Sequence, residues 1–83
     1  MNKIMKENVL LMLSETLSIE LRELETLSST EDLRLVGLDS LKAVEIIIYI
    51  EDMFDCEVSD TDFSIDSVST IDNIIMLFEK YST

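Results

Sequence analysis

The chain has 83 residues, which suits one hydrophobic core, because a protein of this size buries only about 60–65% of its unfolded surface. Its 18 Asp and Glu against 6 Lys and Arg leave a net charge of −12. This charge argues against binding to nucleic acid or to an anionic membrane surface, and it favours partners with positive patches. Because 47% of the residues are hydrophobic, we expect a packed core rather than the disorder of many acidic chains.

The residue types present exclude several classes of function. With no histidine and one cysteine, Cys56, the chain has no disulfide, no cysteine-based metal site and no Ser-His or Cys-His pair. We therefore expect no catalytic residue and no metal site, and we interpret Cys56 as a small core or surface residue. The longest apolar runs, 9–13 and 46–50, have five residues each, whereas a membrane span needs about 20. Without a span or a convincing signal peptide, we expect a cytoplasmic protein.

The first helix is expected to run from about Asn2 to Leu17. Its apolar residues recur at i, i+4, i+7 and i+8, the spacing of one buried face: Met5, Val9, Met12 and Leu13. Residues 18–38 are then expected to form a long loop, with one short helical turn near residues 19–24. This loop is too rich in leucine for a free linker, so we expect it to pack on the helices, and loops of this length are often functional.

The second helix is expected from Ser40 to Phe54, with Asp39 as its N-cap, because a carboxylate can accept hydrogen bonds from the free amides of the first turn. The expected buried side comprises Leu41, Val44, Ile47, Ile48 and Phe54. The expected exposed stripe comprises Lys42, Glu45, Tyr49 and Asp52. Ile46 and Ile50 lie off the core stripe, so we expect them to be half exposed.

Two further helices complete the predicted fold. A short third helix is expected from Ser59 or Asp60 to about Asp66, and a fourth from a capping box at residues 69–72 to about Tyr81. The buried face of the fourth helix is Ile71, Ile74, Ile75 and Phe78. Proline is absent and glycine occurs once, so helices are favoured over strands. The predicted fold is all-α, a small four-helix bundle of three longer helices and one short one, with a long loop between helices 1 and 2.

The segment Gly37-Leu38-Asp39-Ser40-Leu41 is the most informative part of the chain. The only glycine lies three residues before a serine at a predicted helix start. The free amides and partial positive charge of a helix N-terminus favour a phosphate ester at such a serine. A simpler interpretation is that Asp39 and Ser40 only cap the helix. With no histidine to activate it, Ser40 cannot be a catalytic nucleophile, so any reaction here is performed by another protein.

Residues 33–45 resemble the signature of acyl carrier proteins, which bind phosphopantetheine. The family pattern reads Leu-x-x-x-Gly-x-Asp-Ser-Leu followed by Val-Glu, and seven positions match: Leu33, Gly37, Asp39, Ser40, Leu41, Val44 and Glu45. The resemblance continues through residues 51–58, similar to the acidic end of the family's helix 2, and residues 68–71, similar to the start of its helix 4. It covers nearly the whole chain, which implies a single carrier domain over residues 1–83.

The resemblance implies a cofactor, partners and site residues. A 4′-phosphopantetheine arm would be transferred from coenzyme A to Ser40, flanked by Asp39 and Leu41, by a phosphopantetheinyl transferase. The arm's thiol would carry acyl or related intermediates as thioesters in fatty acid, polyketide or related biosynthesis. The protein itself would be no enzyme. Other partners would be loading and processing enzymes with basic patches, docking on Leu41, Val44, Glu45 and Asp52, and we expect a monomer that binds neither nucleic acid nor membranes.

Some features depart from the fatty-acid members of the family. Leu38 and Lys42 stand where those members usually have alanine and an acidic residue, and Ser59 replaces a frequent proline. Residues 37–45 are more similar to carriers of polyketide and nonribosomal peptide pathways, so a peptidyl or aminoacyl carrier is one alternative. Another alternative, from a different class, is an unmodified acidic helical adaptor.

Two further patterns are ambiguous. Ile46, Ile50, Phe63 and Ile75 are candidates to line a slit for an acyl chain, but the same residues would equally suit the core. Residues 60–66 imitate the start of a calcium loop, with acids at Asp60, Asp62 and Asp66. The sixth and twelfth positions would be Ile65 and Ile71 instead of the required glycine and glutamate, so we do not predict a calcium site.

Overall fold

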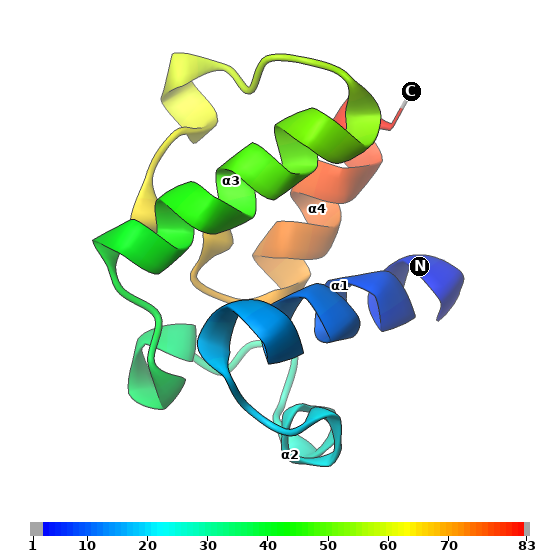
Figure 1. Cartoon of the computed structure of the whole chain (residues 1–83), viewed down its shortest axis with the longest axis vertical. Helices are drawn as coiled ribbons and strands as arrows, with labels where there is room; N and C mark the ends of the chain where they lie inside the picture. The colour runs from blue at the N-terminus through cyan, green and yellow to red at the C-terminus, as the bar shows by residue number, and fades with distance from the viewer. Residues whose placement is uncertain (1–2, 83) are drawn as a thin grey trace.

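The computed structural model describes residues 3–82, and the side chains of residues 5–82. Three longer helices, α1 (Lys3–Leu17), α3 (Ser40–Phe54) and α4 (Ile71–Tyr81), pack around one core, and a short helix, α2 (Leu21–Thr26), lies in the first crossover (Figure 1). Three 3₁₀ turns complete the connections: η1 (Leu33–Val36), η2 (Asp60–Asp62) and η3 (Ile65–Val68). This part of the chain contains no strand, and the predicted all-α bundle is confirmed. Asn2, the expected start of the first helix, lies outside the described residues.

The helical turn expected near residues 19–24 is present as α2, Leu21–Thr26, but the expected third helix is not a continuous helix. The expected third helix over residues 59–66 is instead two 3₁₀ turns, η2 and η3, and the short α-helix is α2. Ser59 Oγ accepts from the backbone N–H of Thr61, and Ser64 Oγ accepts from that of Ser67, so each serine starts its own turn. Such local side-chain bonds compete with a continuous helix, which explains the interruption.

The core is built from the inward faces of α1, α3 and α4. The predicted face of α4 is confirmed and that of α1 nearly so: Met5 is half-buried, and the other predicted residues are buried, namely Val9, Met12, Leu13, Ile71, Ile74, Ile75 and Phe78. The rings of Phe54 and Phe78 meet edge to face, with centroids 5.4 Å apart. Thr70 caps α4 by accepting from the backbone N–H of Asn73 at 3.0 Å, so the cap lies one residue after the predicted Ser69.

The predicted buried face of α3 was partly wrong: Ile47 is buried as expected, but several of its neighbours are not where the sequence placed them. Ile46 and Ile50 are fully buried, whereas Leu41, Val44 and Ile48 are exposed. This helix carries two apolar stripes, and periodicity alone does not distinguish them. Packing against α1, α4 and η3 selects the stripe Ala43, Ile46, Ile47 and Ile50. Since Ile46, Ile50 and Ile75 are core residues, they do not line an open slit; of the four slit candidates, only Phe63 is exposed.

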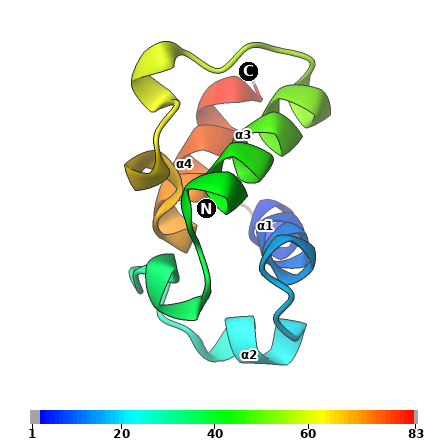
Figure 2. The same cartoon turned by 60° about the vertical axis from the view of Figure 1, so that its left-hand side comes forward.

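The long crossover is anchored to the core and to the start of α4. Leu24, Leu33 and Leu38 are buried, as expected for a packed loop. The Leu33 N–H donates to the Ser69 carbonyl at 2.7 Å, and the Asp72 N–H donates to the Ser29 carbonyl at 3.0 Å. As a result α2 lies at the opposite end of the molecule from η2 (Figures 1 and 2). None of the helices in residues 3–82 has the length and apolar character needed to cross a membrane.

Candidate functional site

A left-handed turn at Gly37 directs the chain into α3. Gly37 has φ of +112°, a conformation that side chains rarely adopt, and its N–H donates to the Leu33 carbonyl. A Cβ atom here would meet nothing within 4 Å, so backbone conformation, and not lack of space, requires glycine. The next residue, Leu38, is buried, which fixes the turn to the core. The turn therefore places Asp39 and Ser40 at the start of α3.

Asp39 caps α3 and leaves Ser40 free. Asp39 Oδ1 accepts from the Lys42 N–H at 2.9 Å, and its carbonyl accepts from the Ala43 N–H at 2.9 Å. Ser40 is the first residue of the helix and is exposed. The N–H groups of Ser40 and Leu41 have no acceptor within the helix, as at any helix N-terminus. An accessible hydroxyl beside free amides and a partial positive charge fits a phosphate ester attached to the Ser40 Oγ.

A cleft of about 190 Å³ adjoins Ser40. Its walls come from two separate parts of the chain: Ser40, Ala43, Val44 and Ile47 of α3, and Phe63, Ser64 and Ile65 of the η2–η3 segment. Phe63 is 44% exposed and lines the same cleft as Ser40. Sequence reasoning identified Phe63 but missed Ser64 and Ile65, because only the tertiary contact between η3 and α3 brings them to the serine.

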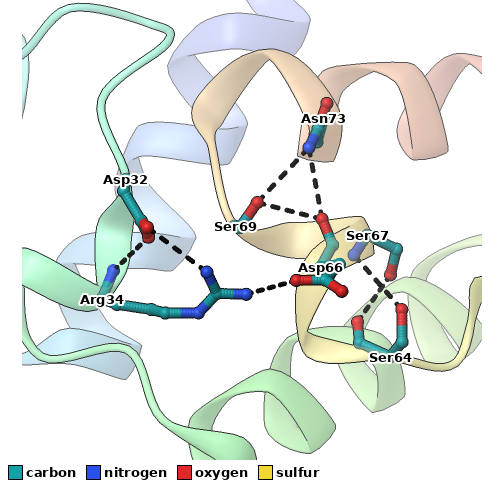
Figure 3. Close-up of polar contacts among 7 residues, drawn as sticks. All are labelled: Asp32, Arg34, Ser64, Asp66, Ser67, Ser69 and Asn73. Atoms are coloured by element: carbon teal, nitrogen blue, oxygen red, sulfur yellow. Dashed lines mark hydrogen bonds and ion pairs between the residues drawn. The ribbon is translucent and has the colours of Figure 1, made fainter.

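An arginine joins the two loops that flank the start of α3. Arg34, in η1, forms ion pairs with Asp32 and with Asp66 of η3 (Figure 3). The hydrogen bond to Asp66, together with the charges of Asp32 and Asp66, raises the pKa of the Arg34 guanidinium above its ordinary value. Asn73 Nδ2 also donates to the Asp66 carbonyl at 3.2 Å, which ties η3 to α4. These contacts tie η1, which directly precedes the Gly37–Ser40 turn, to η3 and α4.

A second polar cluster holds η2, directly before Phe63. Asp62 Oδ2 accepts from Lys80 Nζ at 2.6 Å and from the Tyr81 hydroxyl at 2.7 Å. The Tyr81 oxygen accepts in turn from the Ser59 N–H at 2.9 Å. The bond from Lys80, followed by that from Tyr81, lowers the pKa of the Asp62 carboxyl below its usual value. Asp62 and Asp66 thus belong to separate ion pairs, and no group of three metal-ligating residues occurs in the described part of the chain.

The other predicted site residues share an exposed face of α3. Leu41, Val44, Glu45 and Asp52 are all exposed, at the i, i+3, i+4 and i+11 positions of one helix stripe. Ile48 is exposed between them, at i+7, although the sequence placed it in the core. Leu41, immediately after Ser40, is 67% exposed. The structure therefore places an accessible, partly apolar stripe next to the serine.

Comparison with protein families gives an independent result. The family described as "Phosphopantetheine attachment site" matches residues 7–75, which include the whole turn and α3. No curated protein and no solved structure matches the chain significantly. In this family 4′-phosphopantetheine is attached covalently to a serine, and the members interact with a phosphopantetheinyl transferase and with biosynthetic enzymes. The chain belongs to this family: it is a phosphopantetheine-bearing carrier protein and not an enzyme.

Proposed function

We propose that Ser40 bears the phosphopantetheine arm. The observation that carries this proposal is the exposed Ser40 hydroxyl on the first turn of α3, behind the Asp39 cap. The Ser40 Oγ attacks the β-phosphorus of coenzyme A within the transferase, a phosphodiester forms, and adenosine 3′,5′-bisphosphate leaves. The hydroxyl proton passes to a base of the transferase.

The attachment site is tested by intact-mass spectrometry after incubation with coenzyme A and a broad-specificity transferase. The wild-type chain gains the mass of one phosphopantetheine group, and Ser40→Ala gains none. Ser40→Ala retains the fold, because an exposed first-turn serine contributes little packing. Ser64→Ala, which changes another serine of the same cleft, is the matched control and is modified normally. A modified Ser40→Ala protein would refute the assignment.

We propose further that the cargo is an acyl intermediate of a polyketide or related pathway. Leu38 and Lys42 support this against a fatty-acid role. Leu38 is buried beneath the turn, and Lys42 places a positive charge two residues after Ser40. An aminoacyl or peptidyl cargo is the alternative, and loading distinguishes the two: we expect mass gain with malonyl-coenzyme A and an acyltransferase. Mass gain only with an amino acid, ATP and an adenylation enzyme favours the alternative. The unmodified adaptor is not retained, because membership of the family implies a covalent cofactor.

Partner enzymes are proposed to dock on the stripe Leu41, Val44, Glu45, Ile48 and Asp52. The net charge of −12 favours basic partner surfaces, and Leu41 and Ile48 supply apolar area between the acids. Reversing Glu45 or Asp52 to lysine is expected to slow transferase modification, while stability changes by less than about 0.5 kcal/mol. Raising the salt concentration is expected to weaken binding, because screening at physiological ionic strength already limits charge interactions to about 8 Å.

Glu79→Lys is the matched control, because it reverses an exposed acid on α4 and leaves α3 unchanged. Initial modification rates are measured for all three variants at low and high salt. Equal slowing by Glu79→Lys would show that only the overall charge matters. Rates unaffected by Glu45→Lys, Asp52→Lys and salt would place the docking surface elsewhere.

A further inference from the structure

A cleft of about 540 Å³, larger than the one at Ser40, lies between α1 and α2. Its floor is formed by the buried residues Leu10 and Leu24 and by Ile71 at the start of α4. Leu11 and Leu21 form its walls on α1 and α2. Its volume falls within the range of about 300–1,000 Å³ that is usual for ligand sites. We refer to this feature as the α1–α2 groove.

Leu24 is the one fully buried side chain of α2, and Leu21 packs only partly against the core. Leu24 is buried, but the polar contacts of α2 are local to the crossover. Thr26 Oγ1 donates to the Glu23 carbonyl at 2.7 Å, and Arg22 pairs with Glu20 at 3.0 Å. The apolar walls on both sides of the groove consequently remain uncovered.

One wall of the groove is Leu11, an exposed leucine that is not part of the hydrophobic core. Leu11 is 52% exposed in the middle of α1, although the buried face of that helix is complete without it. A single exposed leucine is ordinary, but an exposed leucine on the wall of an apolar cleft contributes to a continuous apolar surface of the kind that marks interaction sites. Leu21 at the start of α2 and Leu27 at its C-cap, both half-buried, extend this surface.

The charges at the rim define what would cover the groove. Glu7 and Lys6 lie on the α1 side and Glu25 on the α2 side, and all three are exposed. None of them forms an ion pair within the described residues. A complementary surface therefore needs an apolar ridge with a basic residue on each flank, facing Glu7 and Glu25, and an acid near Lys6. An amphipathic helix with leucine-type residues at i, i+3, i+4 and i+7, basic flanks and one acid placed near Lys6 has this arrangement.

We propose that the α1–α2 groove binds an amphipathic, basic-flanked helical segment of a partner protein. The groove and the cleft at Ser40 have no lining residue in common, so the two can be occupied at once. A partner held in the groove leaves Ser40 and the exposed stripe of α3 accessible to enzymes. The groove is thus a second contact surface, which keeps the carrier near a partner while enzymes act on the arm. This proposal does not depend on which residue bears the arm.

The probe is a synthetic helical peptide with leucines at i, i+3, i+4 and i+7, lysines on both flanks and one glutamate placed to face Lys6, added to the ¹⁵N-labelled full chain. We expect amide shifts at Leu11, Leu21 and Glu25. Leu11→Gln and Glu25→Lys are each expected to weaken binding about tenfold. Ile48→Gln and Glu45→Lys are matched controls that make the same changes on α3, and they are expected to leave the affinity within about twofold. All four positions are exposed, so the variants keep the fold, which circular dichroism verifies.

Three results would overturn the proposal. The first is peptide-induced shifts that map to Leu41 and Ile48 instead of the groove. The second is evidence that the groove does not bind the peptide. Either Leu11→Gln and Glu25→Lys change the dissociation constant no more than the controls do, or millimolar peptide causes no amide shift. The third is a dimer, detected by sedimentation equilibrium and abolished by Leu11→Gln, which would show that a second copy of the chain occupies the groove.

Discussion

At the scale of single residues, Gly37 illustrates how backbone geometry positions the site. Its φ of +112° is what allows η1 to end and α3 to begin with Asp39 and Ser40 in place. Ser18 and Asp55 also have positive φ, at 57° and 49°, but these values lie in the left-handed region that non-glycine residues can visit. Only at Gly37 does the conformation demand glycine.

Gly37→Ala is expected to lower the free energy of unfolding by about 1–2 kcal/mol, because alanine is strained at this φ even though space is available. Urea denaturation measures the change. The strain also displaces Ser40, so the rate of transferase modification is expected to fall. Ser18→Gly, at the other end of the crossover, is the control, and its stability is expected to change by less than about 1 kcal/mol. A Gly37→Ala protein as stable as the wild type would show that the turn relaxes without cost.

At the scale of elements, the contacts of Asp62 connect the end of α4 to the segment that carries Phe63. The Asp62 carboxylate accepts from Lys80 and Tyr81, and its pKa is lowered from 3.8. A lowered pKa in the folded state means that the contribution to stability is complete above about pH 3.8 and is lost as the pH falls through the lower, folded value. The connection is therefore intact at neutral pH and weakens in acid.

Asp62→Asn is accordingly expected to lower the urea midpoint at pH 7, and the difference from wild type is expected to shrink below about pH 3.8. Asp60 lies in the same turn, and it forms no ion pair within the described residues. Asp60→Asn is therefore the control, and it is expected to leave the urea midpoint at pH 7 unchanged. Hydrogen exchange of residues 59–64 locates the effect. A difference between Asp62→Asn and wild type that does not vary between pH 2 and pH 7 would contradict the role of the carboxylate charge.

At the scale of the whole molecule, the excess of acids opposes the compact state. The chain carries −12 within principal dimensions of 30 × 27 × 19 Å. At about 0.01 M salt the screening length is about 30 Å, so acids on opposite sides of the protein still repel one another, whereas at about 1 M it is about 3 Å. The free energy of unfolding of a small domain is often only about 5 kcal/mol. Charge repulsion therefore lowers this free energy by a significant fraction.

Sodium chloride is therefore expected to raise the melting temperature, by roughly 4–8 °C for each kcal/mol of repulsion that is screened. Melts at increasing salt measure the effect by circular dichroism. A Glu57→Lys and Glu79→Lys double variant, both exposed acids outside the α3 stripe, is expected to show a smaller salt dependence. Magnesium chloride at equal ionic strength separates screening from weak binding of divalent ions. A melting temperature independent of salt would show that charge repulsion does not limit stability.

The sequence by itself determined the features that depend on local chemistry. The start of α3 at Ser40, its Asp39 cap and its end at Phe54 were all predictable, because a cap and a helix require only neighbouring residues. The Gly37–Ser40 turn and the resemblance to carrier proteins were readable for the same reason. Most of the buried residues of α1 and α4 followed from periodicity, and α4 has one dominant apolar stripe.

Only the tertiary structure decided the features that depend on distant contacts. α3 has two apolar stripes, and packing against α1, α4 and η3 buried Ile46 and Ile50 and left Leu41 and Ile48 exposed. Ser64 and Ile65 reach the cleft at Ser40 through the contact of η3 with α3, and the Arg34–Asp66 pair joins residues 32 positions apart. Such contacts are determined by how the helices pack together, and a pattern within one helix does not contain that information.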